Sequence, residues 1–284
     1  MGYFSLAFAS AFLYAFWALG LGVYRGRLSN WLIILISAAG GTATYAIVGT
    51  LTGELTFDPG DVMPGLLGGL LNVCATYLLL KAYQRGKVAI ASGVVATYVI
   101  VPLGYSVYSG QPFTGLVIVG VLLMLAGLVT FYLVSIRERE DGETSKGTTT
   151  AILFALGAAL CWGVSTVVID TGTRVSLTGT MLASMVPQIV VTGILVMVTA
   201  RGQIKKMTPR AYAVLIATGI CLAAANIAFY TAANEGNLGI TAVISSLDPL
   251  ILAVLAIFFF KQKLRGPEWV AFAIVVAGSC IVVA

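Results

Sequence analysis

Long apolar runs alternate with short polar connections along the whole chain. A bilayer core of about 30 Å needs about 20 apolar residues in a helix, and each run reaches roughly that length. The connections carry charges or the turn residues glycine and proline, which end helices. The pattern predicts an all-α membrane protein with ten transmembrane helices, at residues 3–23, 31–52, 62–83, 88–109, 114–136, 149–171, 177–200, 209–231, 238–260 and 267–284.

The composition agrees with this class and removes several others. Hydrophobic residues make up 59% of the 284 residues and charged residues only 10%, whereas soluble domains carry about 25% charged residues. The chain has no histidine, so the commonest metal ligand and general base is missing. Its four cysteines show no CxxC spacing, which would indicate a zinc site or redox motif. We therefore predict no catalytic residue, metal or cofactor.

The basic residues predict the orientation of the helices. The five odd-numbered connections, with the run ends that border them, hold 15 lysines and arginines, and the even-numbered ones hold only Arg174. By the positive-inside rule the odd-numbered connections face the cytoplasm and both termini lie outside. Because these charges sit beside membrane segments, the net charge of +5 does not indicate a nucleic-acid partner. We expect a multi-pass protein of the cell (inner) membrane.

Two parts of the chain resemble each other at a fixed offset. The segment 82–86 (AYQRG) is followed by Ile90, and the segment 232–236 (AANEG) is followed by Ile240 at the same spacing. An internal repeat predicts five helices at 1–137, a cytoplasmic linker at 138–148 and five more at 149–284. Five is an odd number, so the two halves must be inverted relative to each other, as in many alternating-access transporters.

Asp248 is an acidic residue near the middle of an apolar run. A charge at that depth costs about 2.5–3.5 kcal/mol on insertion scales, so such residues usually face a cavity or a partner. The alternative is a hydrogen bond to a neighbouring helix. Asp170 lies at the predicted outer end of its run, where we expect it to be solvated.

Deep aromatic and amide side chains are candidates for the wall of the same cavity. Trp17 and Trp162 lie well inside their runs and not at headgroup depth, and buried tyrosines need hydrogen-bond partners. Core packing remains the alternative for the tryptophans, and bridging between helices for the amides. The predicted substrate-binding residues are Tyr14, Trp17, Tyr77, Tyr98, Trp162, Asn226 and Asp248.

Small residues and prolines predict details of packing. Gly65 and Gly69 have the spacing of a small-xxx-small ridge, which favours close contact between helices. Pro102, Pro187 and Pro249 lie inside apolar runs and free backbone carbonyl groups there, so they can bend or gate their helices.

Short motifs in the second half resemble the EamA-like branch of the drug/metabolite transporter superfamily. They are the segment 159–163 (ALCWG), the segment 245–249 (SSLDP) and the tail from Pro267 to Gly278. The resemblance implies a ten-span transporter. The family often has an aromatic residue where Asp248 stands, and Tyr98 keeps that aromatic in the first half. Ten-span relatives are generally drawn with cytoplasmic termini, opposite to the orientation that the charges predict.

The favoured hypothesis is a secondary transporter that moves amino acids or organic cations and amines by alternating access. Aromatic faces and one carboxylate suit a positively charged group. An intramembrane enzyme and a non-transporting receptor or scaffold are the alternatives. The expected partners are a small-molecule substrate and the lipid bilayer, with the proton as a candidate coupling ion. One chain should suffice for transport, because both halves are in it.

Overall fold

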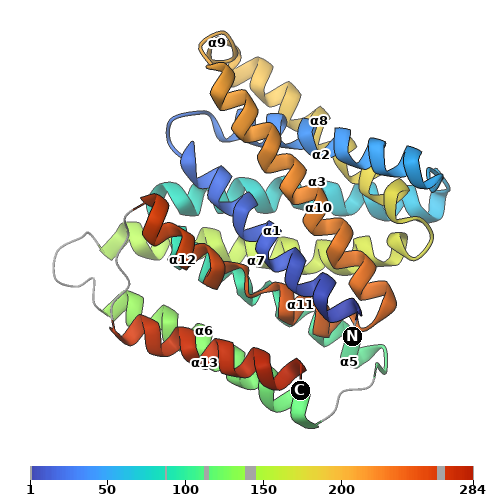
Figure 1. Ribbon diagram of the computed structural model, residues 1–284. Helices are drawn as coiled ribbons and strands as arrows, with labels where there is room; N and C mark the ends of the chain where they lie inside the picture. The colour runs from blue at the N-terminus through green and yellow to red at the C-terminus, as the bar shows by residue number, and fades with distance from the viewer. Residues whose placement is uncertain (1, 87, 112–114, 138–144, 261–265, 284) are drawn as a thin grey trace.

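The computed structural model describes residues 2–86, 88–111, 115–137, 145–260 and 266–283. These residues are largely helical, and no strand occurs among them (Figure 1). The long helices are α1 (Gly2–Val23), α2 (Asn30–Thr52), α3 (Pro59–Arg85), α6 (Gly115–Arg137), α7 (Ser145–Thr173), α8 (Leu177–Thr199), α10 (Pro209–Glu235) and α13 (Gly266–Val283). The shorter elements are α4 (Val88–Val95), the 3-10 helix η1 (Ala96–Val99), α5 (Ile100–Tyr108), α9 (Arg201–Ile204), α11 (Leu238–Ser245) and α12 (Asp248–Phe260).

The outward faces of the helices are apolar. Within the described residues, seven helical stretches are long and apolar enough to cross a membrane, and shorter apolar helices add to them. Large hydrophobic side chains point away from the protein, with Leu51 81% exposed and Val198 78% exposed. Such a surface is stable against lipid tails and unstable against water. The chain is therefore a multi-pass membrane protein.

Helices α3 and α10 are built alike. Each has 27 residues, begins with a proline and follows an extended N-cap residue, Asp58 or Thr208. Proline suits this first position because its missing N–H group would have no partner there. Each helix ends at a glycine whose N–H group donates to an alanine carbonyl four residues earlier, Gly86 to Ala82 at 2.9 Å and Gly236 to Ala232 at 3.0 Å. These are the glycines of the predicted repeat.

Two of the predicted helices are broken near their centres. The run 88–109 consists of α4, η1 and α5, and the run 238–260 consists of α11 and α12 with a turn at Ser246 and Leu247. Pro249 explains the second break, since its ring removes the N–H group that would bond Ser245. The run 88–109 stays helical through the 3-10 turn, whereas the prediction of a continuous helix was wrong at 238–260, because hydropathy alone cannot register a break between two apolar segments.

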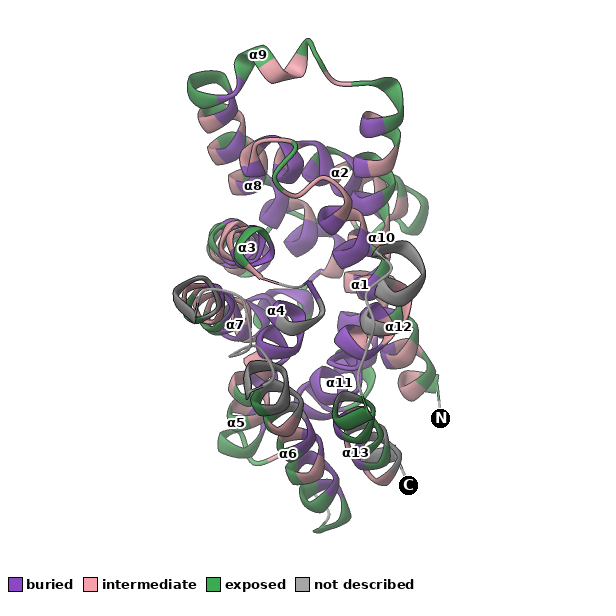
Figure 2. Ribbon diagram, turned by 90° about the vertical axis from the view of Figure 1, so that its left-hand side faces the viewer, coloured by how far each residue is buried: buried purple, intermediate pink, exposed green. Residues whose placement is uncertain are grey.

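Contacts between helices group them into two bundles (Figure 2). The first bundle contains α1, α2, α10, α11 and α12, with α1 and α2 both packed on α10. The second bundle contains α3, α4, α5, α7 and α8, with α7 and α8 both packed on α3. Helices α2 and α8 connect the bundles, and α6 packs against α13 beside them (Figure 1). Each bundle thus takes one long helix from the other part of the chain.

Glycines allow the closest approaches within each bundle. A Cβ atom on Gly219 of α10 would overlap the carbonyl oxygen of Ser37 on α2, and one on Gly69 of α3 would overlap that of Ser184 on α8. Gly65, one turn from Gly69, also approaches the backbone of α8, and a Cβ atom there would overlap the carbonyl oxygen of Thr180. The predicted role of Gly65 and Gly69 in close helix packing is confirmed.

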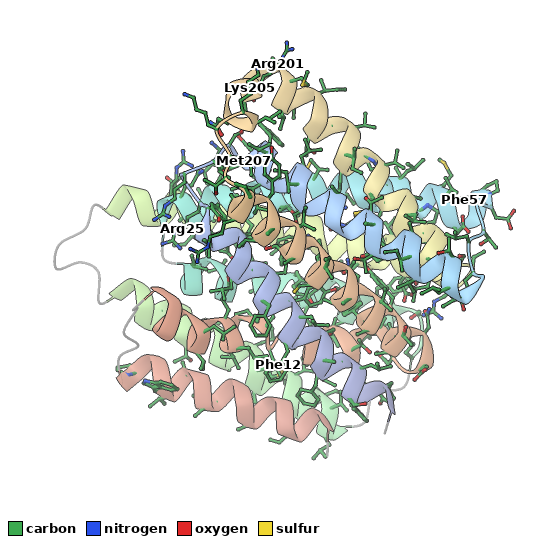
Figure 3. The ribbon with its side chains drawn as sticks, turned by 45° about the horizontal axis from the view of Figure 1, so that its top comes forward. Phe12, Arg25, Phe57, Arg201, Lys205 and Met207 are labelled. Carbon is green, nitrogen blue, oxygen red and sulfur yellow. The ribbon has the colours of Figure 1, made fainter. Side chains whose placement is uncertain are left out.

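The loops divide between two ends of the molecule. Helix α1 begins and α13 ends at the same end (Figure 1). Phe57 marks one end, and Arg25, Arg201 and Lys205 lie toward the other (Figure 3). Residues 138–144 of the predicted linker lie outside the described residues, and α7 already begins at Ser145.

Asp170 corrects one expectation from the sequence. Its carboxylate is buried, with 1% of the side chain exposed, and Oδ2 accepts a bond from Nε of Arg174 at 3.0 Å. Arg174 lies four residues later, one helical turn away, so it reaches back over the end of α7. The prediction that Asp170 is solvated was therefore wrong.

Candidate functional site

A cavity lies between the two bundles, near the middle of the molecule. Side chains from α1, α10 and α12 of the first bundle form one wall, and side chains from α3, α4, η1, α7 and α8 of the second form the other. About 930 Å³ is free of protein atoms here, including the mouth, and about 90 Å³ of it can hold the centres of water-sized molecules. The structure brings six of the predicted residues into this wall: Tyr14, Trp17, Tyr98, Trp162, Asn226 and Asp248.

Asp248 is held where the broken helix restarts. It is the first residue of α12, so its carboxylate lies at a helix N-terminus, where free N–H groups and the helix dipole favour a negative charge. Among the described residues of the cavity wall, Asp248 is the only one with a charged side chain. The break in the helix therefore both exposes the carboxylate to the cavity and stabilises it there.

Asn226 joins three helices through its amide. The hydroxyl of Tyr14 on α1 donates to Oδ1 of Asn226 on α10 at 2.6 Å. Nδ2 of the same amide donates to the hydroxyl of Tyr45 on α2 at 2.8 Å. Tyr45 is fully buried, so this network fixes the position of the Tyr14 phenol from behind the cavity wall.

Two tryptophans face each other across the boundary between the bundles. The ring centroids of Trp17 on α1 and Trp162 on α7 are 5.6 Å apart, and their planes meet at 72°. Edge-to-face pairs of this kind contribute about 0.5–1.5 kcal/mol beyond the area they bury. Phe229 of α10 packs edge-on against Tyr14, with centroids 6.4 Å apart. The cavity is thus lined by aromatic rings from both bundles.

Four tyrosines line the cavity together with Asp248: Tyr14, Tyr83, Tyr98 and Tyr230. Tyr98 comes from η1 of the second bundle, opposite α12. Phenol groups can donate to a ligand as well as accept from it, so this cluster offers polar contacts next to the carboxylate.

Tyr77 lies elsewhere. It is absent from the described residues that line the cavity, and its ring is stacked on Trp31 of α2 with centroids 4.1 Å apart and planes 6° apart. Lys81, one turn further along α3, places Nζ 5.4 Å from the Tyr77 ring centroid. The structure therefore separates Tyr77 from the other six predicted residues.

The wall also contains hydroxyl residues that sequence reasoning passed over. Tyr83 and Ser92 share a hydrogen bond of 2.6 Å between α3 and α4, and Ser165 donates to the carbonyl oxygen of Gly68 at 2.9 Å. Serines occur widely in membrane helices and carry little signal alone. Asn72 and Gln188 also line the cavity, and their amides could either bridge helices or bind a ligand.

The chemistry of the cavity suits a positively charged organic group. One carboxylate, several aromatic faces and neutral hydroxyl and amide groups line it. Cations bind over aromatic faces with about 0.5–2 kcal/mol per contact. No cluster of acidic and cysteine side chains able to hold a metal ion occurs in the part of the chain that the structure describes.

Comparison with known proteins places the second half of the chain in a family. Residues 149–284 match the model of the EamA-like transporter family. This part of the chain is therefore similar to the family. The resemblance predicted from the sequence is confirmed by this match.

The fold of the whole chain has a counterpart among solved structures. A crystal structure with 17% sequence identity matches with a TM-score of 0.76, covering 98% of this chain and 94% of its own. At this identity the likeness concerns the fold alone. No curated protein matches the chain.

Within the EamA-like half, Asp248 departs from what the family resemblance implies. The resemblance implies an aromatic residue at this position, and the chain has one at Tyr98, the corresponding position of the first half. The two positions lie at offset 150, one at the break of each broken helix. The substitution gives the cavity a charge on one side only.

Proposed function

We propose that this protein is a secondary transporter that carries amino acids or organic cations and amines across the membrane by alternating access. The observation that carries the proposal is the position of Asp248 on a broken helix, facing an aromatic cavity between two bundles of an EamA-like chain. Burying an unpaired carboxylate in a membrane is costly. A positively charged substrate would offset this cost by pairing with it.

The proposed architecture is ten transmembrane helices in a 5+5 inverted repeat, with units at 1–137 and 149–284 and a linker at 138–148. The equal lengths of α3 and α10, their matching glycine caps and their offset of 150 residues support the duplication. So do the equivalent glycine contacts, Gly69 on Ser184 and Gly219 on Ser37. In this proposal the broken pairs α4–α5 and α11–α12 each count as one span.

The two bundles are the proposed moving units. Each contains three long helices and one broken helix, and the cavity lies between them. Rocking one bundle against the other would open the cavity to one side while closing it to the other, which is how inverted repeats are thought to work. The binding residues are Tyr14, Trp17, Tyr98, Trp162, Asn226 and Asp248. Asn226 acts through the two tyrosines that it holds.

The charges suggest how the transporter lies in the cell membrane. The proposed orientation puts the odd-numbered connections in the cytoplasm, because they and the run ends beside them hold 15 of the 16 basic residues. The small-molecule substrate and the bilayer are the proposed partners, and a proton on Asp248 is a candidate for coupling. One chain carries both bundles, so a monomer suffices.

Counterflow in proteoliposomes tests the proposal. Purified protein is reconstituted with an unlabelled amino acid or quaternary amine inside, and uptake of the labelled compound from outside is followed. We expect transient accumulation for at least one cation of the panel and none for organic anions of similar size. Protein-free vesicles are the control. Failure with every cation, by protein that remains folded, would favour the enzyme or the receptor alternative.

A further inference from the structure

The beginning of α2 and the end of α3 meet at the end of the molecule that carries the basic loops. Helix α2 belongs to the first bundle and α3 to the second. Any motion that separates the bundles on this side of the cavity must therefore break this contact. The inference drawn from it rests on the proposed function.

Two interactions hold the contact together. Trp31 and Tyr77 are stacked, with ring planes 6° apart and centroids 4.1 Å apart. Next to them, Nε2 of Gln84 donates to Oδ1 of Asn30 at 2.8 Å. Asn30 is buried, with 6% of its surface exposed. The ammonium group of Lys81 lies over the outer side of this cluster, 5.4 Å from the Tyr77 ring centroid.

At the opposite end of the molecule, α8 and α10 are the counterparts of α2 and α3, at offsets of 147 and 150 residues. The positions that correspond to Trp31 and Tyr77 there are Thr178 and Ile227, which carry no aromatic rings. Asn234, the counterpart of Gln84, donates to the carbonyl oxygen of Thr173 at 3.1 Å, and Thr173 lies on α7 and not on α8. The aromatic stack of the basic-loop end is therefore not repeated at the opposite end.

We propose that Asn30, Trp31, Tyr77 and Gln84 form a gate that closes the cavity on the side of the basic loops. Because the equivalent contact at the other end lacks the stacked rings, the closed state on the basic side is favoured over its mirror image. The resting transporter therefore presents its cavity to the side of the loop that contains Phe57. Tyr77 acts in transport by gating and makes no contact with substrate.

A cross-link tests the gate directly. In a variant without the four native cysteines, Asn30→Cys and Gln84→Cys are joined by oxidation in proteoliposomes, and a third cysteine at Asn72 reports on the cavity. An impermeant maleimide applied on the basic-loop side should then label Asn72→Cys at least tenfold more slowly, and reduction should restore the rate. The matched control joins Gly86→Cys to Ala151→Cys, whose Cβ atoms would be 3.2 Å apart within the second bundle.

Weakening the stack tests the asymmetry without a cross-link. Tyr77→Leu should raise labelling of Asn72→Cys from the basic-loop side, relative to the other side, by roughly three- to tenfold, the equilibrium effect of losing one aromatic pair. Tyr108→Leu is the control, because Tyr108 is 90% exposed at the far end. An unchanged ratio, or an unchanged rate after efficient cross-linking, would overturn the gate. Labelling from only one side in every variant would instead overturn alternating access.

Discussion

Gly69 of α3 lies directly against the carbonyl oxygen of Ser184 on α8, with no space for a side chain between the two helices. The same relationship recurs between Gly219 and Ser37 in the other bundle. These contacts position the helices whose neighbouring residues line the cavity. The spacing between α3 and α8 therefore depends on the absence of one methyl group.

Gly69→Ala is expected to destabilise the protein by about 1–3 kcal/mol, because the added methyl group overpacks the crossing of α3 and α8. Thermal unfolding of the purified protein in detergent measures the effect as a lower Tm. Gly104→Ala is the matched control, since Gly104 is helical and has open space around its Cβ position. Equal Tm values for the two variants would contradict the packing argument.

Asp248→Asn is expected to lower kcat/KM for cation transport by roughly 10- to 100-fold, the difference between a charged and a neutral hydrogen-bond partner. The amide has nearly the same shape, so Tm and expression should stay close to those of the wild type. Counterflow measures the change. Glu235→Gln is the control, because Glu235 is exposed at the end of α10. Wild-type rates for every cation would refute the role of the carboxylate.

Tyr14→Phe is expected to raise KM several-fold and to cost about 0.5–1.5 kcal/mol of stability, because it leaves Oδ1 of Asn226 without its donor. Tyr45→Phe should cost a similar amount of stability, since it removes the acceptor for Nδ2. Titration of initial counterflow rates gives KM, and Tm gives stability. Tyr108→Phe should change neither. A loss of stability with unchanged KM would limit the network to a structural role.

Arg174→Gln is expected to destabilise the protein more than Asp170→Asn does. Removing the arginine leaves a buried carboxylate without its partner, whereas the second change removes the buried charge itself. Because 48% of the Arg174 side chain is exposed, solvent weakens the pair, and we expect a loss on the order of 1–3 kcal/mol. Comparison of the Tm values of the two variants shows which change destabilises the protein more. The reverse order would show that the pair adds little to the fold.

Single cysteines at Gln203 and Phe57 are expected to react with an impermeant reagent from opposite sides of the membrane. Phe57 lies at one end of the molecule, and Gln203 lies in α9 between Arg201 and Lys205, which are toward the other end (Figure 3). The basic residues around Gln203 predict that it faces the cytoplasm. Labelling of the protein without its native cysteines, in intact cells and in inverted vesicles, shows which of the two positions faces the cytoplasm. Reaction of position 203 in intact cells would reverse the orientation.

The helices were predictable because a helix that crosses the bilayer core needs about 20 apolar residues. The run predicted at 62–83 is found as α3 at Pro59–Arg85, longer at both ends because its proline start and glycine cap lie in polar sequence. The breaks at η1 and at Ser246 escaped prediction, since both flanking segments are apolar. Pro249 did mark the second one.

The sequence predicted which kinds of side chain line the cavity, but not which individual residues do so. A carboxylate deep in an apolar run had to face something polar, so Asp248 stood out. Tyr77 and Tyr98 look alike in sequence, yet one stacks on Trp31 and the other lines the cavity. The difference depends on which neighbours surround α3 and η1 in the fold, and these neighbours come from distant parts of the chain.

The exchange of long helices between the bundles also sets an order of events during synthesis. Helices α1 and α2 find their main partner, α10, only after some 180 further residues have been made, which takes a ribosome roughly 10–40 s. Until then Tyr14 and Tyr45 lack the amide of Asn226, and the glycine face of α2 meets lipid. A nascent chain that stops after α6 therefore has no route to a stable first bundle, and quality-control proteases should recognise it.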